Sequence, residues 1–156
     1  MARSVNDRLQ DETIAHGLYV NRYGTGVARR MVALLSKMDA DLVAKLLVLL
    51  DGKRADTYSA RRLASLLAGV RELNQQAYEP VNAALARELT RYVEYEVGYQ
   101  FDLFSSIIPK QILRHVPLQS IAPEQVYASA VAQPFQGRLL KEWGQKLETD
   151  RLDKIT

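Results

Sequence analysis

Apolar residues recur at steps of three and four along most of this chain, which is the spacing of amphipathic helices. The clearest run consists of Val27, Met31, Leu35, Met38, Leu42, Leu46 and Leu49. Four neighbours, Val32, Leu34, Val43 and Leu47, widen the stripe, which predicts a helix packed against two others. No alternation typical of a strand extends beyond four positions. The predicted fold class is therefore all-α, an elongated helical bundle with long kinked helices.

The first helix is predicted to begin at Val5, because Ser4 and Asp7 have the spacing of an N-terminal cap and its partner. Each glycine inside a helix costs about 1 kcal/mol relative to alanine. The Gly24-Thr25-Gly26 segment therefore predicts a kink or a short break, and Gly52 predicts the C-terminal cap of the helix that follows.

A second helical block is expected to begin near Thr57 or Ser59 and to reach about Ser105. Its apolar stripe includes Leu63, Leu66, Leu67, Val70 and Leu73, and it continues on the far side of Pro80 with Ala77, Val81, Leu85, Leu89, Tyr92 and Val93. Proline removes one helical hydrogen bond and crowds the preceding turn. Since the stripe continues, Pro80 is expected to kink one long helix.

Prolines divide the remainder of the chain. Residues 109–122 are expected to form an irregular connection with a short turn, and Pro123 fits the first turn of a helix through about Ala132. The last helix is predicted to start near Gly137 and to bury Leu139, Leu140, Trp143, Leu147 and Ile155. The expected organisation is a main helical bundle over 1–108, a Pro-punctuated linker with a short helix over 109–136, and over 137–156 the start of a C-terminal helix that continues in a longer protein.

Composition narrows the chemistry. The absence of Cys excludes disulfides, thiolate metal sites and a Cys nucleophile. The longest apolar run, residues 46–50, is far short of a membrane span, and the N-terminus lacks the apolar region of a signal peptide. We expect a soluble chain made in the cytosol, without a membrane partner. The net charge of +3 permits a nucleic-acid or acidic-protein neighbour without requiring one.

None of the motifs predicts a catalytic or metal-binding site. Glu12 and His16 have metal-ligand spacing, but the third ligand is lacking, so an exposed ion pair one helical turn apart is expected. A di-iron bundle would need Glu-x-x-His motifs, so Glu88, Glu94, Glu96 and Asp102 are expected to form a solvated face. Gly24-Thr25-Gly26 lacks the third glycine or the Gly-Lys-Ser/Thr of a nucleotide loop. The prediction is a non-enzyme with no catalytic residue, no cofactor and no metal.

Aromatic residues are the most distinctive side chains. Tyr92, Tyr95 and Tyr99 form a helical stripe that Phe101 and Phe104 extend, and two interpretations stay open: core packing with the hydroxyls at the surface, or a partner interface. Phe135 and Trp143 flank a predicted helix start. We expect them to fix the terminal helix to the bundle or to the next subunit.

The block Pro134-Phe135-x-Gly137 with Trp143 is preceded by a basic helix holding Tyr19, Tyr23 and Arg29-Arg30 and by the Glu94-Tyr95-Glu96 stretch. In this arrangement the chain resembles the N-terminal helical region of phage head morphogenesis proteins, the Mu F-like minor head proteins. The resemblance implies a structural virion component, made in the host cytoplasm, that joins the procapsid in several copies beside the portal and capsid proteins. The family's diagnostic domain lies downstream of this region.

Two functional hypotheses follow. The first is a helical docking domain that binds the portal or the capsid interior through Tyr92, Tyr95, Tyr99, Phe101, Phe135 and Trp143. The second is a nucleic-acid-associated helical protein that contacts packaged DNA through Arg29, Arg30, Arg61 and Arg62. Binding to phosphates weakens steeply with salt, whereas an apolar interface is much less sensitive.

Overall fold

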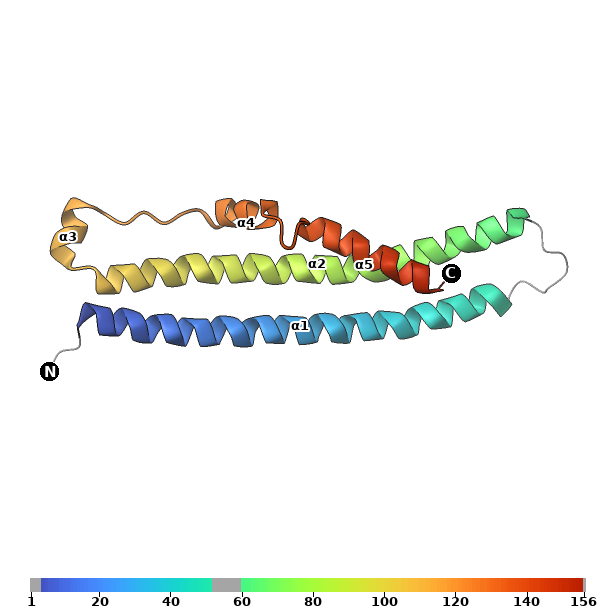
Figure 1. Ribbon diagram of the computed structural model, residues 1–156, viewed down its shortest axis with the longest axis horizontal. Coiled ribbons are helices and arrows are strands. Elements are labelled where there is room, and N and C mark those ends of the chain that lie inside the picture. Colours follow the sequence, from blue (N-terminus) through green and yellow to red (C-terminus); the bar gives the residue numbers. More distant parts are fainter. Residues whose placement is uncertain (1–3, 52–59, 156) are drawn as a thin grey trace. The chain divides into compact units, whose positions relative to one another are not determined.

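The computed structural model describes residues 4–51 and 60–155, and these residues form five helices and no strand (Figure 1). The helices are α1 (Val5–Asp51), α2 (Ala60–Ile107), α3 (Lys110–His115), α4 (Pro123–Ala132) and α5 (Leu140–Ile155). The predicted all-α class is confirmed. Two helices, α1 and α2, contribute most of the residues.

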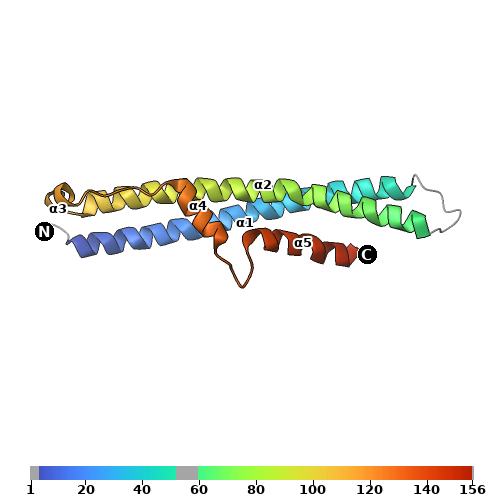
Figure 2. The same ribbon diagram turned by 90° about the horizontal axis from the view of Figure 1, so that it is seen from above.

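Packing divides the chain into two compact units, each described here by itself. Unit 1 combines residues 1–28 with 86–133, and unit 2 combines residues 29–85 with 134–156. In unit 1 the first part of α1 lies antiparallel beside the last part of α2, as both ribbon views show (Figures 1 and 2), and α3 and α4 follow. Unit 2 contains the remainder of α1 and α2 together with α5. The expected organisation into residues 1–108, 109–136 and 137–156 stays a prediction.

Helix α1 begins as expected and then continues further than expected. The Ser4 hydroxyl accepts from the Asp7 amide at 3.1 Å, and the Ser4 amide donates to the Asp7 carboxylate at 3.2 Å, which is a capping box. Of the two alternatives predicted at Gly24-Thr25-Gly26, the short break is wrong, because α1 is one helix through these residues, and the kink stays a prediction. Two isolated glycines cost only about 2 kcal/mol, and packing along a helix of 47 residues outweighs that cost.

The second long helix also runs without interruption. Helix α2 passes through Pro80, so the expectation that one helix continues across this proline is confirmed. It ends at Ile107, two residues beyond the predicted end. The predicted cap at Gly52 and the predicted start near Thr57 or Ser59 lie outside the described residues.

The core follows the predicted stripes but is narrow. Among the described residues the buried apolar side chains are Leu42, Ala77, Tyr78, Val81, Val93, Leu103 and Ile107. The predicted widening of the α1 stripe is wrong for Val32, Val43 and Leu47, which are 62%, 54% and 61% exposed. A long helix that packs along one face buries one line of residues and leaves its flanks in solvent.

In the C-terminal third of the chain, some of the predicted helix bounds are confirmed and others are wrong. Helix α4 has the predicted bounds, and the segment expected to be irregular contains the six-residue helix α3. Helix α5 starts at Leu140, three residues later than predicted, because Gln136 and Gly137 take positive φ values of 49° and 78° that no helix contains. The predicted buried face of α5 is also wrong in part, since Leu147 is 54% exposed.

The continuity of α1 gives a test at Gly24. A Cβ added there meets no atom within 4 Å, so Gly24→Ala should raise the free energy of unfolding by about 1 kcal/mol. Gly137 is a matched control, because its surroundings are equally open but its φ is +78°. Gly137→Ala should lower stability by about 1 kcal/mol. Thermal unfolding followed by circular dichroism measures both, and destabilisation by Gly24→Ala would contradict an unbroken helix.

Candidate functional site

Six aromatic rings in unit 1 join α1 to α2, and we call this set the aromatic ladder. Three rings come from each helix and meet in pairs, and as residue numbers rise along α1 they fall along α2. The pairs are His16 with Tyr99 at 4.1 Å between ring centroids, Tyr19 with Tyr95 at 4.5 Å, and Tyr23 with Tyr92 at 5.4 Å. Such ring pairs contribute about 0.5–1.5 kcal/mol each beyond the area that they bury. The ladder therefore sets the register of the two helices.

A tyrosine hydroxyl closes each end of the ladder on a glutamate of the opposite helix. Tyr99 on α2 donates to the backbone carbonyl of Glu12 at 3.1 Å, and the Glu12 carboxylate lies 3.5 Å away. Tyr23 on α1 donates to the carbonyl and to the carboxylate of Glu88, both at 2.9 Å. The two contacts mirror each other. Hydrogen bonds to charged acceptors stabilise more than neutral ones, so these contacts resist sliding of α1 along α2.

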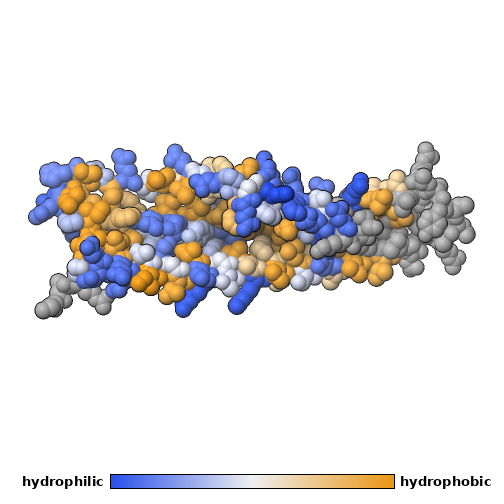
Figure 3. Space-filling model, viewed as in Figure 1, coloured by the Kyte–Doolittle hydropathy of each residue, from blue (hydrophilic) through white to orange (hydrophobic). Residues whose placement is uncertain are grey.

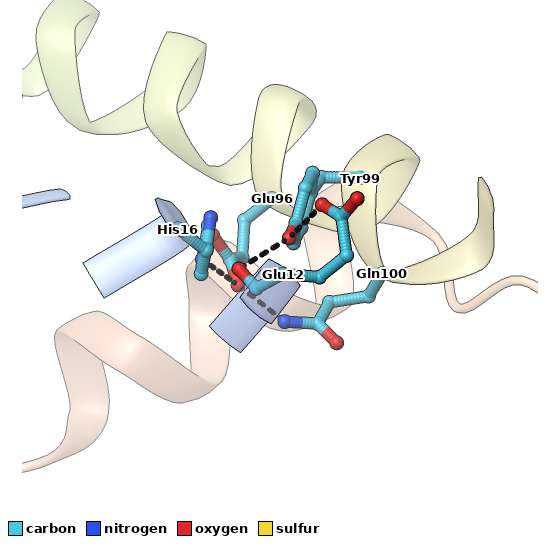
Figure 4. A network of polar contacts seen from close by, with 5 residues as sticks. All are labelled: Glu12, His16, Glu96, Tyr99 and Gln100. Carbon is cyan, nitrogen blue, oxygen red and sulfur yellow. Dashed lines mark hydrogen bonds and ion pairs between the residues drawn. The ribbon is translucent and has the colours of Figure 1, made fainter. Parts of the chain in front are cut away.

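His16 and Glu96 form the polar centre of the ladder (Figure 4). The His16 Nε2 atom lies 3.1 Å from Oε1 and 3.0 Å from Oε2 of the Glu96 carboxylate, and Gln100 donates to Oε1 at 2.8 Å. Because a carboxylate only accepts, Nε2 carries the hydrogen. The expected ion pair of His16 with Glu12 is therefore wrong: His16 reaches across to α2, and Glu12 binds Tyr99 instead. The fully solvated face expected for the α2 acids is wrong as well for Glu88 and Glu96.

The surroundings of the ladder perturb three phenols. Partial removal from water raises the pKa of Tyr92, Tyr95 and Tyr99 above the usual value of 10.0, and the nearby carboxylate of Glu96 adds to each shift. Each phenol therefore stays neutral in the folded chain at pH values where the unfolded chain begins to ionise. The His16 Nδ1 atom is buried without a hydrogen-bond partner among the described residues.

The structure places the predicted partner-binding tyrosines inside this arrangement. Their ring faces contact rings of α1, so they are not an open stacking platform, although Tyr95 remains 38% exposed. Phe101 lies on another face of α2 and is 39% exposed. The sequence did not single out Tyr19, Tyr23, Glu88 and Glu96 as a unit with His16. The sequence does contain a feature that could have indicated this pairing: the aromatic residues at 16, 19 and 23 have the same helical spacing as those at 92, 95 and 99.

Phe101 borders a pocket of about 290 Å³ in unit 1. Its walls come from α2, from α4 and from the connection before α4. They are mainly apolar, with Phe101, Phe104, Leu118, Ile121 and Val126 among the lining residues. Phe104 and Ile121 are 42% and 60% exposed, so the pocket opens at the surface. Figure 3 shows further apolar side chains at the surface around α3, at the left-hand end of the view, where Ile112 and Val116 are exposed.

The Phe135–Trp143 segment of unit 2 is a self-contained turn. Phe135 and Arg138 exchange backbone hydrogen bonds at 2.8 and 3.2 Å, and the positive φ values of Gln136 and Gly137 between them are those of a type I′ turn. The Trp143 indole donates to the Phe135 carbonyl at 2.9 Å, and the Arg138 guanidinium lies 5.5 Å from the centroid of the indole. The Phe135 ring is 69% exposed, so it does not fix the terminal helix to its own bundle, and the alternative of contact with the next subunit stays a prediction.

Helix α5 packs in unit 2 through polar contacts. The fully buried Asn74 side chain donates to the Glu148 carbonyl at 3.1 Å, and Arg151 pairs with Asp39 and lies 5.7 Å from the centroid of the Tyr78 ring. A Cβ at Gly144 would come within 3.1 Å of the Asn82 side chain, so glycine permits a close approach here. The face of α5 that packs is therefore 144–148–151.

The structure describes the side chains of two of the four basic residues proposed for DNA contact. Arg29 and Arg30 are exposed on α1 of unit 2, and the side chains of Arg61 and Arg62 lie outside the described residues. In the described part of the chain no three His, Asp or Glu side chains are grouped so as to hold a metal ion, and no helix is both long and apolar enough to cross a membrane. The chain matches no protein-family model, no curated protein and no solved structure in the comparisons made with them.

The raised pKa values predict a loss of stability in alkali. Folding favours the neutral phenols, so their stabilisation is fully present below pH 10, the unfolded value, and is lost as the pH rises through the higher folded values. Replacing Tyr92 and Tyr95 with Phe should flatten this decline. Urea unfolding between pH 8 and about 11 measures it, with Tyr127→Phe on α4 as the control. An equally steep decline in the Tyr92/Tyr95 double variant would show that other groups cause it.

Proposed function

We propose that this chain is a non-enzymatic structural component that acts by docking on other protein subunits. The assembly that we propose is a phage head, in which the chain associates with the portal and the capsid interior during procapsid assembly. The virion is its proposed location. This proposal takes its biological setting from the resemblance of the Pro134–Trp143 block and the preceding helices to Mu F-like minor head proteins.

One observation carries the docking proposal. The described residues bury seven apolar side chains, whereas seventeen large apolar side chains are exposed. Single exposed apolar residues are ordinary, but grouped ones mark interaction surfaces. Ile14 and Leu18, both 56% exposed, lie one turn apart on α1. Subunits that cover such positions remove this apolar surface from water, which contributes about 25 cal/mol for each Å².

The chemistry of the ladder supports a non-catalytic role. Its carboxylates accept hydrogen bonds from Tyr23, Tyr99 and His16 across the two helices, so these groups hold the helices together. A general acid or base must reach a substrate proton. His16, Glu88 and Glu96 are instead engaged with protein partners, and the ring of His16 is stacked on Tyr99.

Contact with packaged DNA is the second candidate, and the exposed Arg29-Arg30 pair favours it. Guanidinium groups bind phosphates, and such binding depends on the release of counterions. Affinity that rests on six or more phosphate contacts falls about 10³-fold or more between 50 and 200 mM salt. Affinity that rests on apolar contacts changes little over this range.

Co-purification tests the docking proposal. The full chain is co-expressed with the portal protein from the same genome, isolated at two salt concentrations and imaged by electron microscopy. We expect a complex with the portal ring that persists at high salt and is lost in the Ile14→Ser/Leu18→Ser variant. The matched control is Arg29→Gln/Arg30→Gln, which should bind normally. Loss confined to the arginine variant, with a steep salt dependence, would favour the DNA candidate.

A further inference from the structure

The turn at Phe135 presents an aromatic side chain to solvent from a fixed backbone. Phe135 is 69% exposed, whereas its amide and carbonyl are held by Arg138 and its carbonyl also by Trp143. Glu142 links the turn to the first turn of α5, because its carboxylate accepts a hydrogen bond from the Leu139 amide at 2.7 Å. A side chain on such a pre-organised turn loses little entropy when it binds. Aromatic anchors of this kind dominate the affinity of interfaces.

The pocket of unit 1 has the size and the lining to accept a phenyl ring. Its volume is about 290 Å³, and an apolar cavity of about 150 Å³ is enough to hold benzene. Phe101 and Phe104 form part of the wall, so an entering ring would meet other rings as well as Leu118, Ile121 and Val126. Aromatic pairs in offset or edge-to-face contact are favourable.

The charges around the two features have opposite signs. Among the residues that line the pocket, Glu96 is the one with a charged side chain. The turn carries Arg138 directly opposite Phe135 and is followed by Lys141, both exposed. Complementary charge steers two surfaces together and disfavours other orientations.

We infer that the Phe135 turn of one copy of this chain docks into the Phe101–Ile121 pocket of a second copy. This inference deepens the proposed docking function by naming one partner, a second copy of the chain. The two surfaces differ, so the contact is heterologous: each copy offers one turn and one pocket. Copies joined in this way form a closed ring if the rotation between them closes and an open series if it does not.

Two single variants and their mixture test this contact in the full chain by sedimentation velocity over a range of concentrations. Phe135→Ser removes the anchor but keeps the pocket, and Ile121→Arg blocks the pocket but keeps the anchor. Each should weaken self-association about thirtyfold or more, the loss typical of a central anchor residue. Mixing the two should restore one contact and produce a dimer. Val116→Ser is the control, since Val116 is 66% exposed and lines neither surface.

The outcomes separate cleanly. Self-association of Phe135→Ser equal to that of the wild type, a wild-type chain that stays monomeric, or a mixture that forms no dimer would each overturn the inference. Circular dichroism verifies that both variants fold, and should Ile121→Arg unfold, the comparison of Phe135→Ser with Val116→Ser decides. Portal co-purification of Phe135→Ser is measured in parallel. If the Phe135→Ser variant still binds the portal but no longer self-associates, the inference is supported. If the wild-type chain does not bind the portal, only the proposed function is rejected.

Discussion

The aromatic ladder is the constraint on which unit 1 depends. Two helices that meet along a single line of apolar residues can slide by one turn at little cost, because one leucine-like contact replaces another. The ladder removes this freedom, since hydrogen bonds between particular residues accompany its ring pairs. Tyr23 binds Glu88 and Tyr99 binds Glu12, and His16 reaches Glu96 between them. A shift by one turn would break these hydrogen bonds and leave the partly buried carboxylates of Glu88 and Glu96 without these donors, which costs about 1–3 kcal/mol for each group.

In unit 2 the arrangement of the helices is fixed by polar contacts of α5. Its third helix, α5, is held by Asn74, by the Arg151–Asp39 ion pair and by the close approach at Gly144. Polar contacts of this sort specify one arrangement but contribute modestly to stability, because each group gives up water to make them. The type I′ turn before α5 adds to the specification, since it directs the chain into the first turn of that helix.

A chain built in this way keeps much of its apolar surface available. Long paired helices bury one stripe each, so the flanks, the turn at Phe135 and the pocket beside Phe101 remain at the surface. These exposed apolar residues suit contacts with other subunits. Both proposed roles, docking on a phage portal and self-association, depend on such contacts.

The sequence by itself determined the helical class, the capping box at Ser4, the continuity of α2 through Pro80 and the bounds of α4. These features depend on local spacing and on the intrinsic preferences of Ser, Asp and Pro, which a sequence displays directly. Only the tertiary structure decided the continuity of α1 through Gly24–Gly26, the partners of Glu12 and His16, and the packing face of α5. The pairing of rings at 16, 19 and 23 with those at 99, 95 and 92 depends on the register of two helices some 80 residues apart in the chain. Spacing within one helix cannot fix that register, because every turn of the facing helix offers an apolar residue.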